Sequence, residues 1–152
     1  MSKDIISRDY ANDMIFELEK AFWDERGKGA RFRLTTLGRD FFRNKCLPKI
    51  QSTEMTDMVA AIEGVLKENG IIDGMSVTID GRLLRVRIEG CTHRPVEDRM
   101  MAHETKPFAC LPANMIVLAV DEKLNRPAEL AEIKLVDGAC EVLIVLFDKK
   151  PF

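Results

Sequence analysis

The sequence predicts an α+β fold in which N-terminal helices precede a hairpin, a helix and a second hairpin. Apolar residues recur at helical spacing in the first third of the chain, and they alternate with polar residues from Met75 onward. Asp80-Gly81 and Asp137-Gly138 each lie between two alternating segments, as is typical of hairpin turns. We therefore expect one four-stranded antiparallel sheet packed against helices.

The length and composition predict a single domain. The chain has 152 residues, of which 46% are hydrophobic and 32% are charged, a balance that supports a sizeable core. We expect one α+β domain over residues 1–152, with a helical part at 1–52 and a sheet-containing part at 53–152.

Three helices are expected before the first strand. An apolar stripe over residues 10–22 predicts the first, and Gly27-Lys28-Gly29 ends it. The second is expected over residues 35–46. The third has the clearest stripe, over residues 55–66, and Asn69-Gly70 is a typical C-terminal stop.

The sheet-containing part begins with alternating segments at residues 75–79 and 84–88. No period holds from Gly90 to Pro107, which predicts a long loop, either irregular or with a short helical turn around residues 96–102. Long loops are often functional, so this segment is where we expect any chemistry to lie.

The chain ends in a helix and a second hairpin. Pro112 suits a first helical turn, and an apolar pattern continues to Leu124. The strands are expected at residues 131–135 and 140–146. Because the last strand is apolar at both alternating sets of positions, it is expected to be central and covered on both faces.

Composition narrows the functional class. The net charge of −2 argues against direct nucleic-acid binding, which favours a basic excess. No apolar run reaches the roughly 20 residues needed for a membrane span. The N-terminus lacks a signal-peptide pattern, and four widely spaced cysteines suggest no disulfide framework, so a cytoplasmic location is expected.

A metal site is one interpretation of the segment from Cys91 to Cys110. Both histidines of the chain, His93 and His103, lie in it, with the spacing Cys-x-His-x9-His-x6-Cys. Thiolate and imidazole suit zinc and, to a lesser degree, iron. The alternative is that the thiols are buried and the histidines are solvated in a loop.

Cys110 has a second interpretation, because it precedes a predicted helix start. A helix N-terminus lowers a thiol pKa, and His93 or His103 could act as a base. The alternative is simple packing. The sequence shows no nucleotide-binding, metalloprotease or serine-hydrolase motif, so no catalytic residue is assigned and an enzyme is the less favoured class.

Four apolar residues in or after this segment are candidates for lining a ligand pocket. They are Met100, Met101, Phe108 and Met115. Methionine suits adaptable apolar pockets, although at helical spacing it also serves as ordinary core.

The second half of the chain resembles the 4-vinyl reductase-type, or hydrocarbon-binding, domain family. The resemblance runs from about Met55 to Phe147. Its first motif is the segment Gly70-Ile71-Ile72-Asp73-Gly74, followed by a hairpin that ends at Glu89-Gly90-Cys91. The others are a cysteine at a helix start and a final hairpin that contains Glu129 and Cys140. It implies an α+β fold, a buried apolar pocket for a small molecule, and a homodimer.

In sensor members of that family, zinc is held by a cysteine at the helix start, a glutamate and two cysteines of the last hairpin. The resemblance places Cys110, Glu129 and Cys140 at matching positions. Glu132 stands where the remaining cysteine is expected, so the chain departs from the pattern there.

The sequence thus favours a domain that binds or senses a small apolar, aromatic or lipid-like molecule, with a metal on Cys91, His93, His103, Cys110 or Cys140. A metal- or thiol-dependent enzyme is the first alternative. The second alternative is a structural or partner-binding subunit. An exposed apolar patch on the first helix, with Trp23 as part of the patch, would indicate this class.

Overall fold

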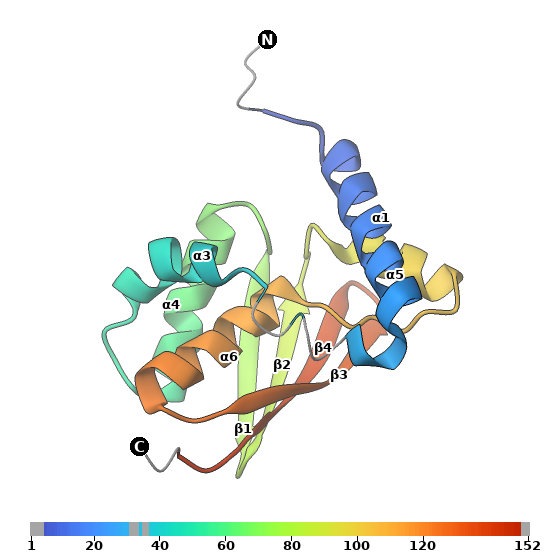
Figure 1. Cartoon of the computed structure of the whole chain (residues 1–152). Helices are drawn as coiled ribbons and strands as arrows, with labels where there is room; N and C mark the ends of the chain where they lie inside the picture. Colours follow the sequence, from blue (N-terminus) through green and yellow to red (C-terminus); the bar gives the residue numbers. More distant parts are fainter. Residues whose placement is uncertain (1–4, 31–33, 35–36, 150–152) are drawn as a thin grey trace.

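The computed structural model describes residues 5–30, 34 and 37–149, and it confirms the α+β class (Figure 1). Its helices and strands, in chain order, are α1 (Arg8–Arg26), α3 (Arg39–Phe41), α4 (Met55–Glu68), β1 (Gly74–Asp80), β2 (Leu83–Glu89), α5 (Arg94–Ala102), α6 (Leu111–Leu124), β3 (Ala128–Val136) and β4 (Ala139–Leu146). That residues 1–152 form one domain stays a prediction.

The four strands form one antiparallel sheet in the order β1-β2-β4-β3. Both hairpins turn where Asp-Gly predicts, and Gly81 and Gly138 adopt positive φ angles of 59° and 74°. The left-handed backbone favours glycine, which has no Cβ to clash there. The last strand, β4, is central, as its sequence predicts.

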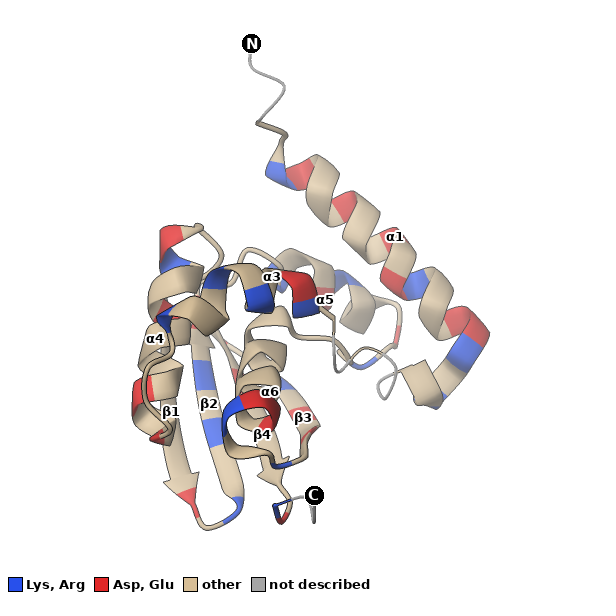
Figure 2. Ribbon diagram, turned by 60° about the vertical axis from the view of Figure 1, so that its left-hand side comes forward, with Lys and Arg blue, Asp and Glu red and all other residues tan. Residues whose placement is uncertain are grey.

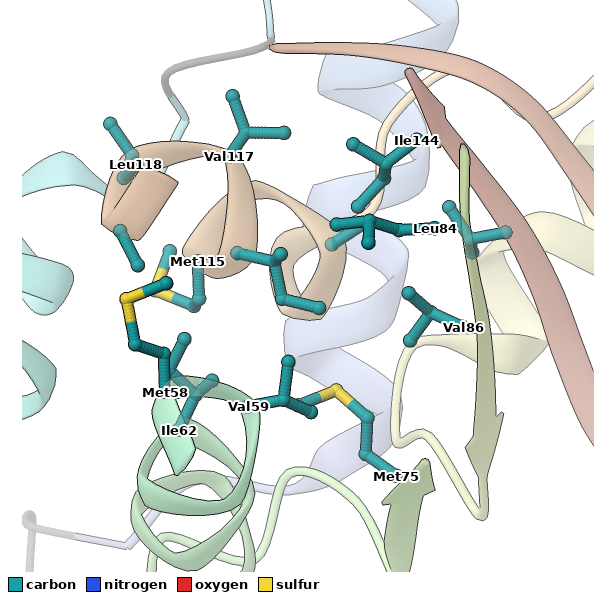
Figure 3. Packing of buried hydrophobic residues seen from close by; sticks show 14 of the residues in the cluster. Met58, Val59, Ile62, Met75, Leu84, Val86, Met115, Val117, Leu118 and Ile144 are labelled. Carbon is teal, nitrogen blue, oxygen red and sulfur yellow. The ribbon is translucent and has the colours of Figure 1, made fainter. Parts of the chain in front are cut away.

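Helices α4 and α6 pack on one face of the sheet and form the main core (Figure 3). The stripe of α4 includes Met58 and Ile62, which lie near Met115 of α6. From the sheet, Leu84 and Ile144 point into the same layer, and all of these side chains are almost fully buried. Burying each contributes roughly 1.5–3 kcal/mol, so this layer supplies most of the stability.

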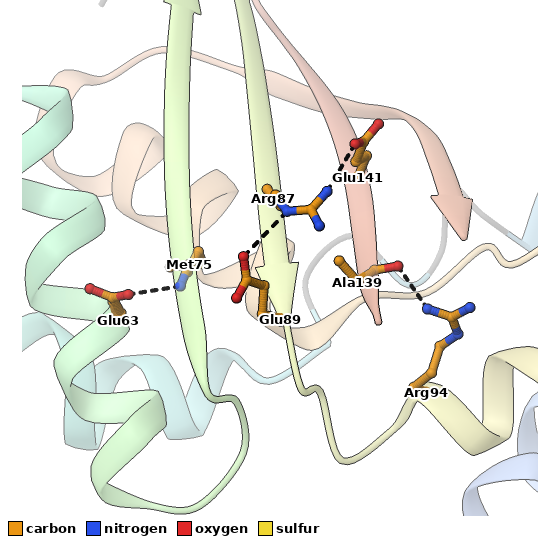
Figure 4. A network of polar contacts seen from close by, with 7 residues as sticks. All are labelled: Glu63, Met75, Arg87, Glu89, Arg94, Ala139 and Glu141. Atoms are coloured by element: carbon orange, nitrogen blue, oxygen red, sulfur yellow. Dashed lines mark hydrogen bonds and ion pairs between the residues drawn. The ribbon is translucent and has the colours of Figure 1, made fainter. Parts of the chain in front are cut away.

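The other face of the sheet is open, and the prediction that β4 is covered on both faces is wrong. Leu143 and Val145 are only half-buried, and Phe147 is 40% exposed. The exposed Arg87 makes ion pairs there with Glu89 of the same strand and Glu141 of β4 (Figure 4). The prediction failed because Leu143, Val145 and Phe147 are apolar, which in the sequence resembles a strand buried on both faces, although they lie among charged residues on an open face.

The predicted loop from Gly90 to Pro107 contains a true helix, α5, which begins at Arg94 with Pro95 in its first turn. It packs against α1 beside the sheet, away from α4 (Figure 1). The second expected helix is shorter and irregular: α3 continues as a π-helical turn, Phe42–Cys46, and a 3-10 turn, Leu47–Lys49. Its expected start at residue 35 lies outside the described residues.

The surface carries both signs of charge. In Figure 2, Lys and Arg residues are interspersed with Asp and Glu residues along α1 and on the other elements. None of the helices in the described part of the chain has the length and apolar character that a membrane crossing requires.

Candidate functional site

A pocket of about 260 Å³ lies between α1, the start of α5 and the start of α6. Its walls come from four separate segments of the sequence. The lining residues are Ile15, Glu19, Leu37, Cys91, His93, Val96, Glu97, Ala109, Cys110, Leu111 and Pro112. Most of these side chains are apolar, and the polar ones are confined to glutamate, histidine and cysteine.

The α1–α5 contact forms one wall of the pocket. Phe16 of α1 packs with Val96 and Met100 of α5 in a second apolar cluster, separate from the main core. Asn12 donates a hydrogen bond from Nδ2 to the Thr92 carbonyl at 3.1 Å, and the Arg99 guanidinium lies 4.0 Å above the Phe16 ring. These contacts hold α1 across the pocket.

The segment before α3 forms the opposite wall. The Asn114 side chain of α6 donates to the carbonyls of Leu34 and Leu37, at 2.8 and 3.1 Å. Gly38 has a φ of 93°, and a Cβ there would clash with the side chains of Leu111 and Met115. This close approach requires glycine and places Leu37 beside Leu111 at the pocket.

Glu97 is the most unusual group at the site, because its side chain is acidic and the residue is only 6% exposed. Burial raises the pKa of Glu97 to about 7, despite a lowering contribution from Arg94. The Cys140 thiol of β4 donates a hydrogen bond to Glu97 Oε2 at 3.1 Å. Near neutral pH, this carboxyl is therefore only partly ionised.

Glu19 of α1 is a second carboxyl in the pocket. Burial raises the pKa of Glu19 to about 7, and the charge of Glu97 adds to the effect. The two glutamates come from different helices, but they are close enough to interact electrostatically.

His93 completes the polar lining. Burial lowers the pKa of His93, which favours the neutral imidazole. Its Nδ1 atom is buried and has no hydrogen-bond partner among the described residues. A buried polar atom without a partner is uncommon, and it is consistent with a ligand that would supply one.

The cysteines near the site are protonated thiols at neutral pH. Burial raises the pKa of Cys91 to about 11 and raises the pKa values of Cys110 and Cys140 as well. Although Cys110 does cap the start of α6, burial outweighs the helix terminus. The arrangement therefore does not favour Cys110 as a nucleophile.

The predicted metal ligands come together only in part. Cys91, His93 and Cys110 line the pocket, and Cys140 is bonded to Glu97 beside it. His103 lies at the exposed end of α5, with its ring 5.4 Å from that of Phe16. Among the residues that the structure describes, no three His, Cys, Asp or Glu side chains form a group that could hold a metal ion.

The ligand set implied by the family resemblance does not fit this arrangement either. Glu129 is exposed on β3 and pairs with Val145, whereas Cys140 pairs with Leu135 at the other end of the strand. Glu132 is also exposed. The metal hypothesis has no support from the positions of these side chains, and it stays a prediction.

None of the four residues expected to line a ligand pocket lies at this one. Met115 is fully buried in the main core, and Met100 belongs to the α1–α5 cluster. Met101 and Phe108 line a larger open groove of about 770 Å³ against β3, where Phe108 stacks on Trp23 with ring centroids 5.3 Å apart. Their role in binding stays a prediction.

The candidate site residues taken from the sequence include neither Glu19 nor Glu97. A signal was present for both. Glu19 follows Ile15 by four residues on the apolar stripe of α1, and Glu97 follows His93 by the same interval. Residues four apart share a helix face, so this spacing places each carboxyl on the same side as its neighbour.

No protein-family model matches the sequence, and no curated protein matches it. A solved structure does: the phenol-responsive sensory domain of the transcription activator PoxR, crystallised with phenol. The match has a TM-score of 0.60 and 12% sequence identity, and it covers 88% of this chain and 73% of that chain. At this identity the likeness shows a shared fold, in agreement with the fold that the family resemblance implies.

Proposed function

We propose that this chain is a sensory or carrier domain whose small-molecule ligand occupies the pocket between α1, α5 and α6. The observation that carries the proposal is the pocket itself, a largely apolar cavity into which a few polar side chains, Glu19, His93 and Glu97, converge. The shared fold with a phenol-responsive sensory domain supports the same function.

The size of the pocket limits the ligand. Drug-sized molecules occupy pockets of roughly 300–1,000 Å³. A cavity of about 260 Å³ therefore suits a smaller molecule, such as one with a single substituted ring. An apolar body would pack against Ile15, Leu37 and Leu111, while a polar group would meet the glutamates and His93.

The test is binding of toluene, phenol and benzylamine, measured by calorimetry and by the shift in melting temperature. Ile15→Trp fills the pocket from α1, and Glu17→Trp, at an exposed position of the same helix, is the matched control. We expect at least one probe to bind the wild type and the control but not Ile15→Trp. Binding of none of them, or equal binding by both variants, would contradict the proposal.

The enzyme alternative is less well supported, because burial keeps the thiols protonated. The metal that the sequence predicts has its own test. Stoichiometric zinc or iron in protein purified without chelator, lost in Cys110→Ser, would establish it. Protein free of metal under those conditions would remove it.

We also propose that two copies associate through the outward face of α1. Tyr10, Met14 and Leu18 recur every four residues there and are 58%, 39% and 71% exposed. Trp23, expected in such a patch, instead stacks on Phe108. Light scattering should show a dimer that Leu18→Glu converts to a monomer; a monomeric wild type at high micromolar concentration would contradict this proposal.

A further inference from the structure

The polar lining of the pocket consists of hydrogen-bond acceptors without a positive counter-charge. Glu19 and Glu97 supply carboxyl oxygens, and His93 supplies a buried Nδ1 without a described partner. No Lys or Arg is among the described residues that line the cavity. Glutamates in such surroundings are rare unless they are paired, and no described cation in this pocket balances the charge that Glu19 and Glu97 carry when ionised.

The nearby cations are engaged elsewhere. Arg94 donates to Asp98 at 2.9 Å and to the Val136 carbonyl at 2.8 Å. It also donates to the Ala139 carbonyl at 2.7 Å (Figure 4). Its guanidinium therefore holds the β3–β4 turn to α5, and its influence on Glu97 is only partial.

Two further cations belong to the α1–α5 layer. Arg99 pairs with Asp13 at 2.8 Å and covers the Phe16 ring, while Lys20 pairs with Asp24 at 2.9 Å. Each is satisfied outside the pocket. Among the described residues, none of these cations faces Glu19 and Glu97 from within the pocket, so a cationic ligand would complement the two carboxyls.

The two carboxyls in the pocket match the donors and the charge of a protonated amine. An ammonium group has three N–H donors and no acceptor, and hydrogen bonds from a charged donor to a carboxylate are stronger than neutral ones. A neutral hydroxyl offers one donor and no positive charge, so it would not compensate the negative charge of the two carboxylates. A purely apolar ligand would offer them neither a donor nor a charge.

We propose that the ligand is a small apolar molecule bearing a protonated nitrogen, an aralkyl amine or amidine, with its cation between Glu19 and Glu97 and its ring against Ile15, Leu37 and Leu111. This inference rests on the proposed function, since it names the ligand class of the same pocket. The neutral state of the His93 imidazole avoids repulsion of the cation.

The test compares three probes of nearly equal size, benzylamine, benzyl alcohol and toluene, by calorimetry on the full chain. We expect benzylamine to bind at least about tenfold more tightly than the other two, which is the difference of one charge-assisted hydrogen bond. Glu19→Gln and Glu97→Gln each keep the shape of the side chain and remove its charge. Each should weaken benzylamine about tenfold or more and leave toluene unchanged.

Glu17→Gln, which removes a charge at an exposed position of α1, is the matched control and should leave benzylamine affinity at the wild-type value. Equal or tighter binding of benzyl alcohol or toluene, blocked by Ile15→Trp, would overturn the amine inference and leave the proposed function standing. Equal loss in Glu17→Gln would reduce the effect to general surface charge and would also overturn it. If none of the three probes binds, the inference and the proposed function fail together.

Discussion

The layer of α4 and α6 on the sheet and the layer of α1 and α5 beside it are built differently. The first buries long, regular apolar stripes and contains almost no polar side chain, whereas the second has a small apolar cluster around Phe16 and Met100. The second layer also holds the pocket, the buried Glu97 and the partly buried Glu19, and an imidazole atom without a described partner. The comparison indicates that the first layer provides stability and that the second provides a binding site at a cost in stability.

The largest expected effect is a difference in the free energy of unfolding between core substitutions in the two layers. Ile62→Ala, in the main core, should lower the free energy of unfolding by about 2–5 kcal/mol, because the cavity cannot close. Met100→Ala is equally buried but should cost less, since α1 can separate locally from α5. Urea denaturation gives both values, and hydrogen exchange should show faster exchange of α1 in Met100→Ala alone. If both variants lose the same free energy of unfolding and α1 exchanges no faster in Met100→Ala, the two layers unfold as one cooperative unit and this prediction is wrong.

The second prediction concerns pH. Folded Glu97 keeps its proton up to about pH 7, whereas an unperturbed glutamate loses it near pH 4.5. Between these values the folded state binds more protons, so the free energy of unfolding falls as pH rises, by on the order of 3 kcal/mol for this group. Glu19 acts in the same direction.

Urea denaturation between pH 5 and pH 8 measures this slope. Glu97→Gln should be more stable than the wild type at pH 8 and should show a shallower slope, because the amide cannot ionise and its oxygen can still accept from Cys140. A wild type that gains stability over this range, or a variant with an unchanged slope, would show that Glu97 is paired or hydrated in a way that the structure does not contain.

A smaller effect is expected from the two buried asparagines that attach outer segments to the core. Asn114→Ala removes two hydrogen bonds and should cost about 1–3 kcal/mol, while Asn12→Ala removes one and should cost about 1 kcal/mol. Both should weaken ligand binding, because each holds a wall of the pocket. Unchanged affinity in both variants would mean that the pocket does not depend on these attachments.

The smallest effect is expected at the surface. Arg99→Ala removes an exposed ion pair with Asp13 and the contact with the Phe16 ring, and it should cost under about 1 kcal/mol, less at high salt. Arg87→Ala, which removes exposed pairs on the open face of the sheet, is the control. A difference of several kcal/mol between them would show that α1 depends on this one arginine.

Regular periodicity made the sheet layer predictable. The stripe of α4 and the two Asp-Gly turns are local signals, and each identified its element correctly. The segment after Gly90 was harder, because Pro95 and four charged residues of α5 conceal the apolar pair Val96 and Met100. The side of α1 that faces α5 could not be read from sequence, since apolar residues lie on both of its faces.

The site was predictable only as a region. Cys91, His93 and Cys110 do lie together at the pocket, but His103 does not, because the regular helix α5 carries it away from them. Glu19 precedes Glu97 by 78 residues in the chain, and only tertiary packing brings the two together. Local spacing contains no information on that contact.

The most direct test of the central claim is methyl-resolved NMR of the full chain with benzylamine and with toluene. We predict that shift changes concentrate on Ile15, Val96 and Leu111 at the pocket and spare Ile62 and Leu84 in the main core. Changes confined to the groove around Met101, or the absence of saturable changes with either compound, would contradict the assignment of the pocket as the binding site.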